Sequence, residues 1–209
     1  PSGCGKSTVL KVLAGLLEPM AGTIMVDDAP LQGGSRHFSY MPQSDLLLDW
    51  YDILDNVCLY GKIHGKKKEA QQQALENLKE FGLAGYEHAY PSQLSGGMRQ
   101  RAAFLRTALC DSDILLLDEP FGALDVITRE DMQDWLNRMR QRLDRTTLLV
   151  THDIDEAIYL SDRILILGQR PATITRIVDV RHPHKDRAWL YAQGELRAAI
   201  HQELSHEVL

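Results

Sequence analysis

The sequence has few cysteines, no long apolar run and no excess of basic residues. Its three cysteines, Cys4, Cys58 and Cys110, are far apart and show no CxxC spacing, which argues against a metal cluster and favours a reducing compartment. No apolar run approaches the roughly 20 residues that a membrane-spanning helix needs, so a partner would have to hold this chain at any membrane. The net charge of −6 offers no basic field that would attract nucleic acid.

What the sequence does contain is an alternation of short apolar strands and amphipathic helices. Its 209 residues suffice for one sizeable core and at most two domains. Strands are predicted at residues 23–26, 37–40, 114–117, 147–150, 163–167 and 173–180, with a turn at Gly33-Gly34. Helices are predicted at residues 8–17, 66–81, 95–109, 128–143 and 186–209. This alternation implies a parallel sheet covered by helices, interrupted by a helical insertion from residue 45 to about residue 109.

A glycine-rich run at the start of the chain matches the phosphate-loop pattern GxxxxGK[ST], except for its first glycine. The run comprises Pro1, Ser2, Gly3, Cys4, Gly5, Lys6, Ser7 and Thr8. Glycines let backbone N–H groups curl around a phosphate chain, and the following helix presents its positive end to the same anion. Lys6 is then placed to neutralise the β- and γ-phosphates, Ser7 to ligate Mg²⁺ and Thr8 to reach the α-phosphate. The alternative is a glycine-rich turn before an ordinary helix.

An apolar strand at residues 114–117 ends in two adjacent carboxylates, Asp118 and Glu119, followed by Pro120. The run of aliphatic residues suits a strand buried on both faces of a parallel sheet. Neighbouring residues of an extended chain point in opposite directions. We therefore predict that Asp118 holds the Mg²⁺ shell while Glu119 acts as a general base on water. The alternative is that these acids only begin a surface turn.

A second candidate anion site lies in the run Leu94-Ser95-Gly96-Gly97-Met98-Arg99-Gln100-Arg101. Ser95 is a good N-cap residue, and Gly96 and Gly97 leave backbone N–H groups open at a helix start. One active site does not need two phosphate cradles. The pattern therefore favours a head-to-tail pair of chains, in which Ser95, Gly96 and Gly97 of one copy close on the γ-phosphate held by the other.

Together these motifs resemble those of ATP-binding cassette (ABC) proteins, whose signature is similar to the run at residues 94–101. The resemblance implies an α/β P-loop NTPase (RecA-like) fold, with a mostly parallel sheet flanked by helices and an inserted all-helical subdomain, that hydrolyses ATP with Mg²⁺. It also implies roles for Gln43 near Mg²⁺ and the attacking water, for Asp125 in the D-loop at the dimer interface, and for His152 between the γ-phosphate and Glu119. Taken alone, Gln43 and His152 are more typical of structural residues, and their order among the other motifs favours the catalytic reading.

The resemblance also predicts how the chain divides. Residues 1–44 and 110–181 would form the two parts of the RecA-like core, residues 45–109 the helical signature subdomain, and residues 182–209 a C-terminal helical tail. In this family an antiparallel sheet with an adenine-stacking aromatic residue precedes the phosphate loop, and neither is found in this sequence. We therefore expect the sequence to be a fragment of a longer protein. The histidines of the tail, which lack an acid or cysteine framework, are expected to be solvated rather than metal-binding.

Among ABC proteins, a single cassette with a short helical insertion resembles a transporter subunit more than the non-transport soluble ATPases of this family. The run from Gln43 to Trp50 and the one from Ser161 to Leu167 resemble importers of the nitrate, sulfonate and taurine group. Importers of thiamine-precursor pyrimidines look similar. The resemblance implies permease subunits as partners, an extracytoplasmic solute-binding protein as an indirect one, and a peripheral position on the cytoplasmic face of the membrane. Apolar residues after Gln43 either fill the helical subdomain or line a groove for a permease helix.

Overall fold

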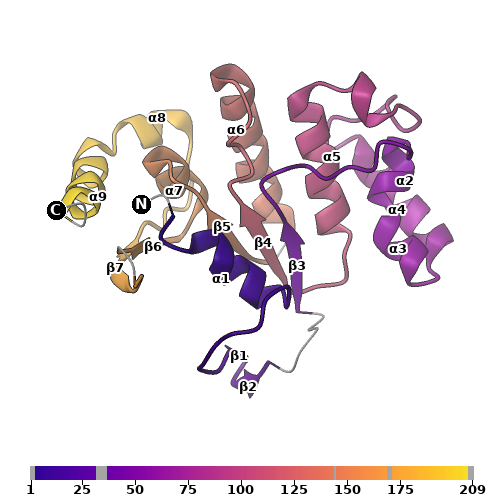
Figure 1. The fold of residues 1–209 in the computed structure, drawn as a ribbon. Helices are drawn as coiled ribbons and strands as arrows, with labels where there is room; N and C mark the ends of the chain where they lie inside the picture. The colour runs from indigo at the N-terminus through magenta and orange to yellow at the C-terminus, as the bar shows by residue number, and fades with distance from the viewer. Residues whose placement is uncertain (1–2, 32–36, 144, 169–170, 207–209) are drawn as a thin grey trace.

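A computed structural model describes residues 3–31, 37–143, 145–168 and 171–206 of the chain. In these residues, three strands form a parallel sheet in the order β3 (Phe38–Met41), β4 (Ile114–Asp118) and β5 (Thr146–Val150). Tyr40 pairs with Leu116, and Leu116 pairs with Leu148. Figure 1 shows this sheet at the centre, with most of the helical insertion on one side and the C-terminal elements on the other. The predicted parallel sheet flanked by helices is confirmed.

Burial explains why β4 occupies the middle of this sheet. Leu115, Leu116 and Leu117 are fully buried, as expected for a strand covered on both faces. Helix α1 (Lys6–Leu13) packs against β3 and β4, and helix α5 (Gly96–Ala108) packs against β3. The carboxyl ends of the parallel strands meet at one edge, and the chain leaves β4 there at Asp118. The fold therefore gathers the residues that follow each strand at this edge.

The strand predicted at residues 163–167 does not join the parallel sheet. It forms β6 (Arg163–Leu167), which pairs antiparallel with β7 (Ile174–Asp179) in a hairpin. The sequence left the pairing of these two strands open. They pair antiparallel because a parallel crossover needs a dozen or more residues and only residues 168–173 separate them. A second hairpin joins β1 (Met25–Val26) to β2 (Ala29–Pro30), and β2 was not predicted. Asp27 and Asp28 have φ of 49° and 63°, as a type I′ turn requires.

The segment predicted as an insertion, residues 45–109, contains helices and no strand among its described residues. It comprises α2 (Ile53–Val57), α3 (Leu59–Ile63), α4 (Lys67–Leu78), the 3₁₀ turn η1 (Pro91–Gln93) and α5. The short helices α2 and α3 had no clear periodicity in the sequence. Helix α6 (Val126–Leu143) begins two residues earlier than predicted, since Asp125 caps it. Trp135 of α6 packs edge-on against Phe81 and Phe104, with ring centroids 4.8 and 5.2 Å away, and so joins the insertion to the core.

Helix α1 is shorter than the predicted span of residues 8–17. It begins at Lys6 and ends at Leu13, because Gly15 takes a positive φ of 72° and the N–H of Leu16 bonds back to the carbonyl of Lys11. Pro19, the predicted stop, lies beyond this end. Helix α4 likewise ends at Leu78 rather than at residue 81, with Gly82 in the left-handed region at φ 66°. Gly15 thus ends α1 earlier than the apolar pattern indicates. Gly82 lies where the sequence predicted a stop signal, and the Phe81 N–H still bonds to the Asn77 carbonyl at 3.1 Å.

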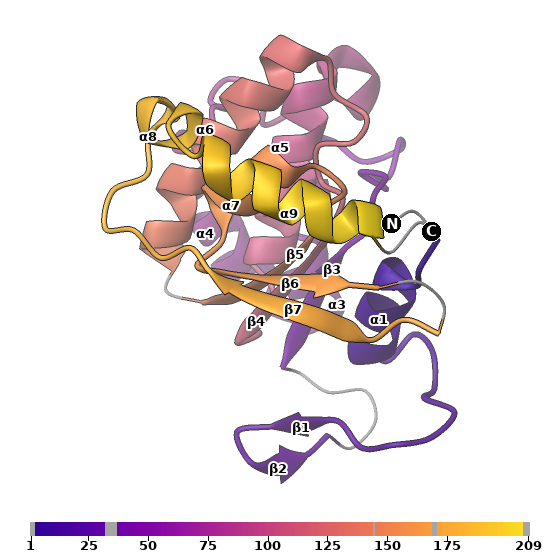
Figure 2. The same ribbon diagram turned by 90° about the vertical axis from the view of Figure 1, so that its left-hand side faces the viewer.

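The C-terminal segment folds as two helices rather than one. Helix α7 (Ile154–Leu160) follows β5, and the tail forms α8 (Arg187–Tyr191) and α9 (Gly194–His206). Figure 2 shows α9 lying along the β6–β7 hairpin, with α8 beside α6 and α7. The predicted turn at Gly33-Gly34 and the helix predicted for residues 207–209 fall outside the described residues. None of the helices described is long and apolar enough to cross a membrane.

Candidate active site

The phosphate loop enters α1 through two residues in the left-handed region. Gly3 and Gly5 have φ of 76° and 107°, a conformation that glycine adopts without steric cost. The N–H of Val9 bonds to the carbonyl of Gly5 at 3.0 Å, which starts the helix. Cys4 is buried, with its thiol sulfur 4.0 Å from Lys6 Nζ. Thr8 is exposed, while Pro1 and Ser2 lie outside the described residues.

Ser7 and Asp118 meet across the sheet edge. Ser7 Oγ donates to Asp118 Oδ1 at 2.8 Å, and the Tyr40 hydroxyl donates to Asp118 Oδ2 at 2.9 Å. Burial, reinforced by this bond to Asp118, raises the pKa of Tyr40 to about 12. Adjacent ligands of an octahedral Mg²⁺ lie about 3 Å apart when each is about 2.1 Å from the ion. The spacing of the Ser7 and Asp118 oxygens therefore fits the ion that the sequence predicts.

Two side chains contact the same carboxylate oxygen of Glu119. Gln43 Nε2 donates to Glu119 Oε2 at 3.2 Å, and His152 Nδ1 lies 3.3 Å from the same oxygen. These residues come from the segments after β3, β4 and β5, so the sheet edge itself brings them together. Glu119 lies just past β4 with a φ of 45°. It therefore diverges from Asp118 through a left-handed turn and not through the strand alternation that the sequence predicted.

The strain at Glu119 is held in place by its surroundings. A non-glycine residue in the left-handed region costs about 1–2 kcal/mol. Two backbone bonds offset this cost, one from Glu119 N–H to the Val150 carbonyl at 2.9 Å and one from Gly122 N–H to the Glu119 carbonyl at 3.1 Å. A Cβ on Gly122 would lie 3.7 Å from Glu119 Oε2 and 3.6 Å from Gln43 Nε2. A side chain at this position would therefore contact both Glu119 and Gln43.

The second predicted anion site lies at the start of α5. Ser95 is exposed and caps the helix, with Ser95 Oγ accepting from the Met98 N–H at 3.3 Å. Gly96 is also exposed, whereas Gly97 is buried, and a Cβ there would lie 2.7 Å from Thr128 of α6. The start of α5 therefore presents backbone N–H groups to solvent, as an anion cradle requires. Close packing on α6 fixes its position.

Asp125 and Gln100 connect this cradle to the acidic strand end. Asp125 caps α6, with Oδ1 accepting from the Thr128 N–H at 3.1 Å. The hydrogen bond from the Thr128 side chain, followed by backbone bonds, lowers the pKa of Asp125. Gln100 of α5 is buried and donates to the carbonyl of Pro120, next to Glu119. Helix α5 is therefore hydrogen-bonded to the loop that carries Glu119 in the same chain.

The structure thus sorts the predicted site residues into two groups. Near the sheet edge lie the phosphate-loop residues and the residues that follow the parallel strands: Lys6, Ser7, Gln43, Asp118, Glu119 and His152. Ser95, Gly96, Gly97 and Asp125 lie instead around the start of α5 and of α6. Tyr40 belongs to the first group and was missed as a site residue. Its position three residues before Gln43, at the start of the motif Tyr40-Met41-Pro42-Gln43, was the available signal, and in the sheet it pairs with Leu116.

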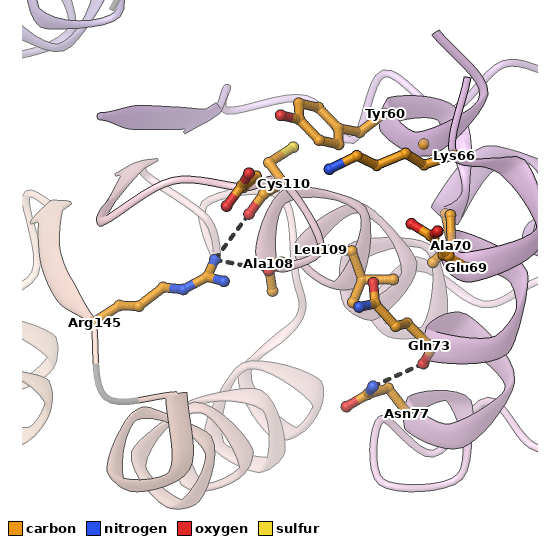
Figure 3. Close-up of a pocket in the computed structure, with 13 residues that line it drawn as sticks. Tyr60, Lys66, Glu69, Ala70, Gln73, Asn77, Ala108, Leu109, Cys110 and Arg145 are labelled. Carbon is orange, nitrogen blue, oxygen red and sulfur yellow. Dashed lines mark hydrogen bonds between the residues drawn. The ribbon is translucent and has the colours of Figure 1, made fainter. Parts of the chain in front are cut away.

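A cavity of about 420 Å³ lies elsewhere, between α3, α4, the end of α5 and Arg145 (Figure 3). Arg145 donates to the carbonyls of Ala108 and Cys110 at 2.8 and 3.1 Å. Burial raises the pKa of the Cys110 thiol. None of the predicted site residues lines this cavity. Arg145 acts there as a cap on the last carbonyls of α5.

Comparison with known proteins agrees with these features. The family model described as "ABC transporter" matches residues 1–122. The chain is 41% identical over 201 residues to the taurine import ATP-binding protein TauB of Yersinia pestis bv. Antiqua (strain Antiqua), covering 96% of this chain and 77% of the relative. It is 51% identical over 171 residues to the formylaminopyrimidine import ATP-binding protein ThiZ of Halalkalibacterium halodurans, covering 81% of this chain and 66% of the relative.

Two further matches concern sulfonate import and a solved cassette. The aliphatic sulfonates import ATP-binding protein SsuB 1 of Rhodococcus jostii (strain RHA1) is 50% identical over 184 residues, covering 88% of this chain and 70% of the relative. The ATP-binding cassette MJ0796, solved as a dimer in a post-hydrolysis state bound to ADP and Pi, has a TM-score of 0.69 and 29% identity. The match covers 87% of this chain and 83% of that chain.

The fold and the site define a P-loop ATPase, with a glycine-rich loop before α1, and with a buried carboxylate and a second acid at the end of one parallel strand. The family match and the sequence identity to curated relatives then assign the chain to one family of such ATPases. The chain belongs to the ABC transporter family.

Proposed function

We propose that this chain is the ATP-hydrolysing subunit that energises an ABC importer, and that Glu119 is its general base. The observation that carries the proposal is the shared contact at Glu119 Oε2, which Gln43 and His152 both reach. A general base needs groups that hold it in place, and both of these side chains contact its carboxylate directly. The Ser7–Asp118 contact lies at the same sheet edge.

The phosphate-loop residues bind and orient ATP. Backbone N–H groups of residues 1–8, curled by Gly3 and Gly5, cradle the phosphates, and Lys6 neutralises the β- and γ-phosphates. Ser7 and Asp118, with Gln43 beside them, hold Mg²⁺, which supplies charge neutralisation to the phosphate oxygens. Tyr40 keeps the Asp118 carboxylate in place through its hydroxyl.

Hydrolysis then depends on Glu119 and His152. Glu119 accepts a proton from the attacking water, and His152 stabilises charge that develops on the γ-phosphate while holding Glu119. The left-handed turn at Glu119 aims the carboxylate away from Asp118, so the two acids do separate jobs.

A second copy of the chain completes each site. Ser95, Gly96 and Gly97 of one copy close on the γ-phosphate held by the other copy, with Asp125 at the interface between them. Their place away from the Glu119 cluster, on an exposed helix start, supports this arrangement. Closing and opening of the dimer would drive permease subunits between two states.

The apolar group after Gln43 supports a permease contact. Leu47 and Ile53 are buried, whereas 59% of Leu46 and 71% of Trp50 are exposed. The first pair fills the helical core, and the second pair offers apolar surface to a cytoplasmic permease helix. Through such permeases the chain would sit at the cytoplasmic face of the membrane and work indirectly with a solute-binding protein.

The transported solute would be a sulfonate such as taurine, as the names of the relatives suggest. A thiamine-precursor pyrimidine is the second candidate, since the relative named for formylaminopyrimidine import is 51% identical over the matched residues. The solute does not touch this subunit. Stimulation of ATP hydrolysis in the reconstituted transporter by taurine, or by formylaminopyrimidine, together with the cognate binding protein would distinguish them.

Replacing Glu119 by Gln tests the proposed base. In the complete natural protein, the Glu119→Gln variant should bind Mg·ATP, form a stable dimer and turn over at least about a hundredfold more slowly, because the proton acceptor is lost. Size-exclusion chromatography with retained nucleotide, together with phosphate release, measures both effects. The matched control is Glu18→Gln, at an exposed position. Normal turnover in the Glu119→Gln variant would rule out Glu119 as the base.

A further inference from the structure

Glu156 is a buried carboxylate that the proposed mechanism does not use. It lies on α7 with 5% of its surface exposed. Thr151 Oγ1 donates to Glu156 Oε2 at 2.6 Å, and Gln133 Nε2 of α6 donates to Glu156 Oε1 at 3.0 Å. Burial raises the pKa of this carboxyl. A buried acid costs free energy unless its hydrogen bonds are satisfied, so both of these bonds matter for its position.

One of these bonds leads directly to the predicted switch residue. Thr151 precedes His152, and Thr151 Oγ1 also accepts from the Asp153 N–H at 3.0 Å. Asp153 in turn caps α7 through bonds from the Asp155 and Glu156 N–H groups at 2.8 and 3.1 Å. The residues on both sides of His152 are therefore held by one network centred on Glu156.

His152 has little packing of its own to hold it. The side chain is 59% exposed, and its contact with Glu119 Oε2 at 3.3 Å is the interaction that places it in the site. The position of such a side chain depends on its backbone, since few neighbours restrict it. The Thr151–Glu156 bond thus controls where the His152 ring can reach.

The other end of the network lies in the C-terminal tail. Gln133 Oε1 accepts from Arg187 NH1 at 3.1 Å, and Arg187 is the first residue of α8. Arg187 also donates to Asp134 Oδ1 at 2.8 Å and to the Glu130 carbonyl at 2.7 Å, and it lies over the Tyr159 ring. A guanidinium with every nitrogen bonded is fixed in geometry. The two ribbon views agree in placing α8 beside α6 and α7 (Figures 1 and 2).

A second contact joins the tail to the same region. Arg197 Nε of α9 lies 2.6 Å from Oδ1 of Asp155, in the first turn of α7. The tail therefore touches both α6 and α7.

We propose that Glu156 is a positioning residue for His152, and that Arg187 makes the C-terminal tail part of the same support. The chain of contacts runs from Arg187 through Gln133 and Glu156 to Thr151, next to His152. This inference rests on the proposed role of His152 in hydrolysis. It assigns the tail a function in setting the catalytic rate, separate from binding of ATP by the phosphate loop.

The test measures kcat and KM for ATP in the complete natural protein. Glu156→Gln should lower kcat about tenfold, since small displacements of a catalytic group reduce the rate steeply, and should leave KM within about twofold. Arg187→Met should also lower kcat, by a smaller factor than Glu156→Gln. Arg181→Met, at a mostly exposed arginine just before the tail, is the control and should change neither value.

The same substitutions in a variant that lacks His152 distinguish a positioning role from general destabilisation of the protein. In a His152→Ala background, Glu156→Gln and Arg187→Met should have no further effect on kcat, because the residue that they position is absent. An equal loss in both backgrounds, or a rise in KM with kcat unchanged, would overturn the inference while leaving the proposed function intact. If the Glu156→Gln variant does not fold, the effects of Arg187→Met in the two backgrounds test the inference by themselves. A His152→Ala variant with normal turnover would instead refute the proposed role of His152, and the inference with it.

Discussion

At the scale of single residues, the buried lysine of the tail is the clearest titratable group. Lys185 is 5% exposed, and its ammonium donates to the carbonyls of Ile158 at 2.7 Å and of Ser161 at 2.5 Å. It also lies over the ring of Trp189, with Nζ 4.9 Å from the centroid. Burial, reinforced by nearby Arg140, lowers its pKa from 10.5 to about 8. The ammonium caps α7 at a desolvation cost that the neutral amine does not have.

We predict that stability conferred by Lys185 rises with pH. Because the folded pKa is lower than the unfolded one, the unfolded chain binds more protons between pH 8 and 10.5, and the free energy of unfolding increases through that window. Compared with a Lys185→Met variant, the natural protein should gain about 2 kcal/mol between pH 7 and 9.5. Denaturant unfolding of both proteins at several pH values measures the difference. A difference that stays constant across this window would contradict the lowered pKa.

The residues of the site divide by how visible they are in the sequence. Lys6, Ser7, Asp118 and Glu119 stand in local motifs whose chemistry is readable from spacing alone. Tyr40 was missed because its bond to Asp118 depends on the register between β3 and β4. Long-range register is not encoded in a local pattern. Glu156 of α7 and Lys185, which caps α7, are also buried through long-range contacts and were missed for the same reason.

At the scale of elements, the packing of α3 on α4 depends on one glycine. A Cβ on Gly61 would lie 2.2 Å from the Cβ of Ala70 and 3.1 Å from the carbonyl of Lys66. The two helices can approach this closely only without a side chain at that position. The contact also lies beside the cavity of Figure 3.

We therefore expect Gly61→Ala to destabilise the protein by about 1–3 kcal/mol, as overpacking in a tight contact does. Gly194→Ala is the control, since a Cβ there meets nothing within 4 Å, and alanine at a helix start should be neutral or slightly stabilising. Chemical denaturation followed by circular dichroism compares the two variants. Equal stability of both would show that α3 and α4 separate without cost.

The boundaries of the helices and strands show what sequence patterns do not predict. The sequence located β4, β5 and α5 within one or two residues, because their apolar periods and caps are strong. It overran α1, which ends early because Gly15 takes a positive φ, and it extended α4 three residues past Leu78. It left the pairing of β6 open, and the short connection to β7 gives a hairpin. Local backbone geometry and connection length decided these cases.

At the scale of the whole molecule, the proposed assembly depends on two predicted phosphate-binding sites. One is at Lys6 and the other is at Ser95, which is exposed in the isolated chain. The sequence predicted both cradles from glycine and cap residues. It also predicted that they serve different chains, which a single chain does not test. The division into core, signature subdomain and tail likewise stays a prediction, with Trp135 and the Arg187 contacts as the joints between the parts.

The central claim is that one nucleotide is gripped by Lys6 of one copy and Ser95 of the other. The most direct test mixes two forms of the complete natural protein, both carrying Glu119→Gln to stop turnover. One form also carries Lys6→Ala and the other Ser95→Arg. A mixed head-to-tail dimer then has both defects in one composite site and none in the other.

The measurement is ATP retained by dimers on size-exclusion chromatography with Mg²⁺. A form with Ser92→Arg, at an exposed serine outside the cradle, in place of Ser95→Arg serves as the control and should dimerise with ATP by itself. The account predicts that neither defective form retains ATP in a dimer alone, and that their mixture retains one ATP per dimer. Retention by the Ser95→Arg form alone, or no retention by the mixture, would contradict it.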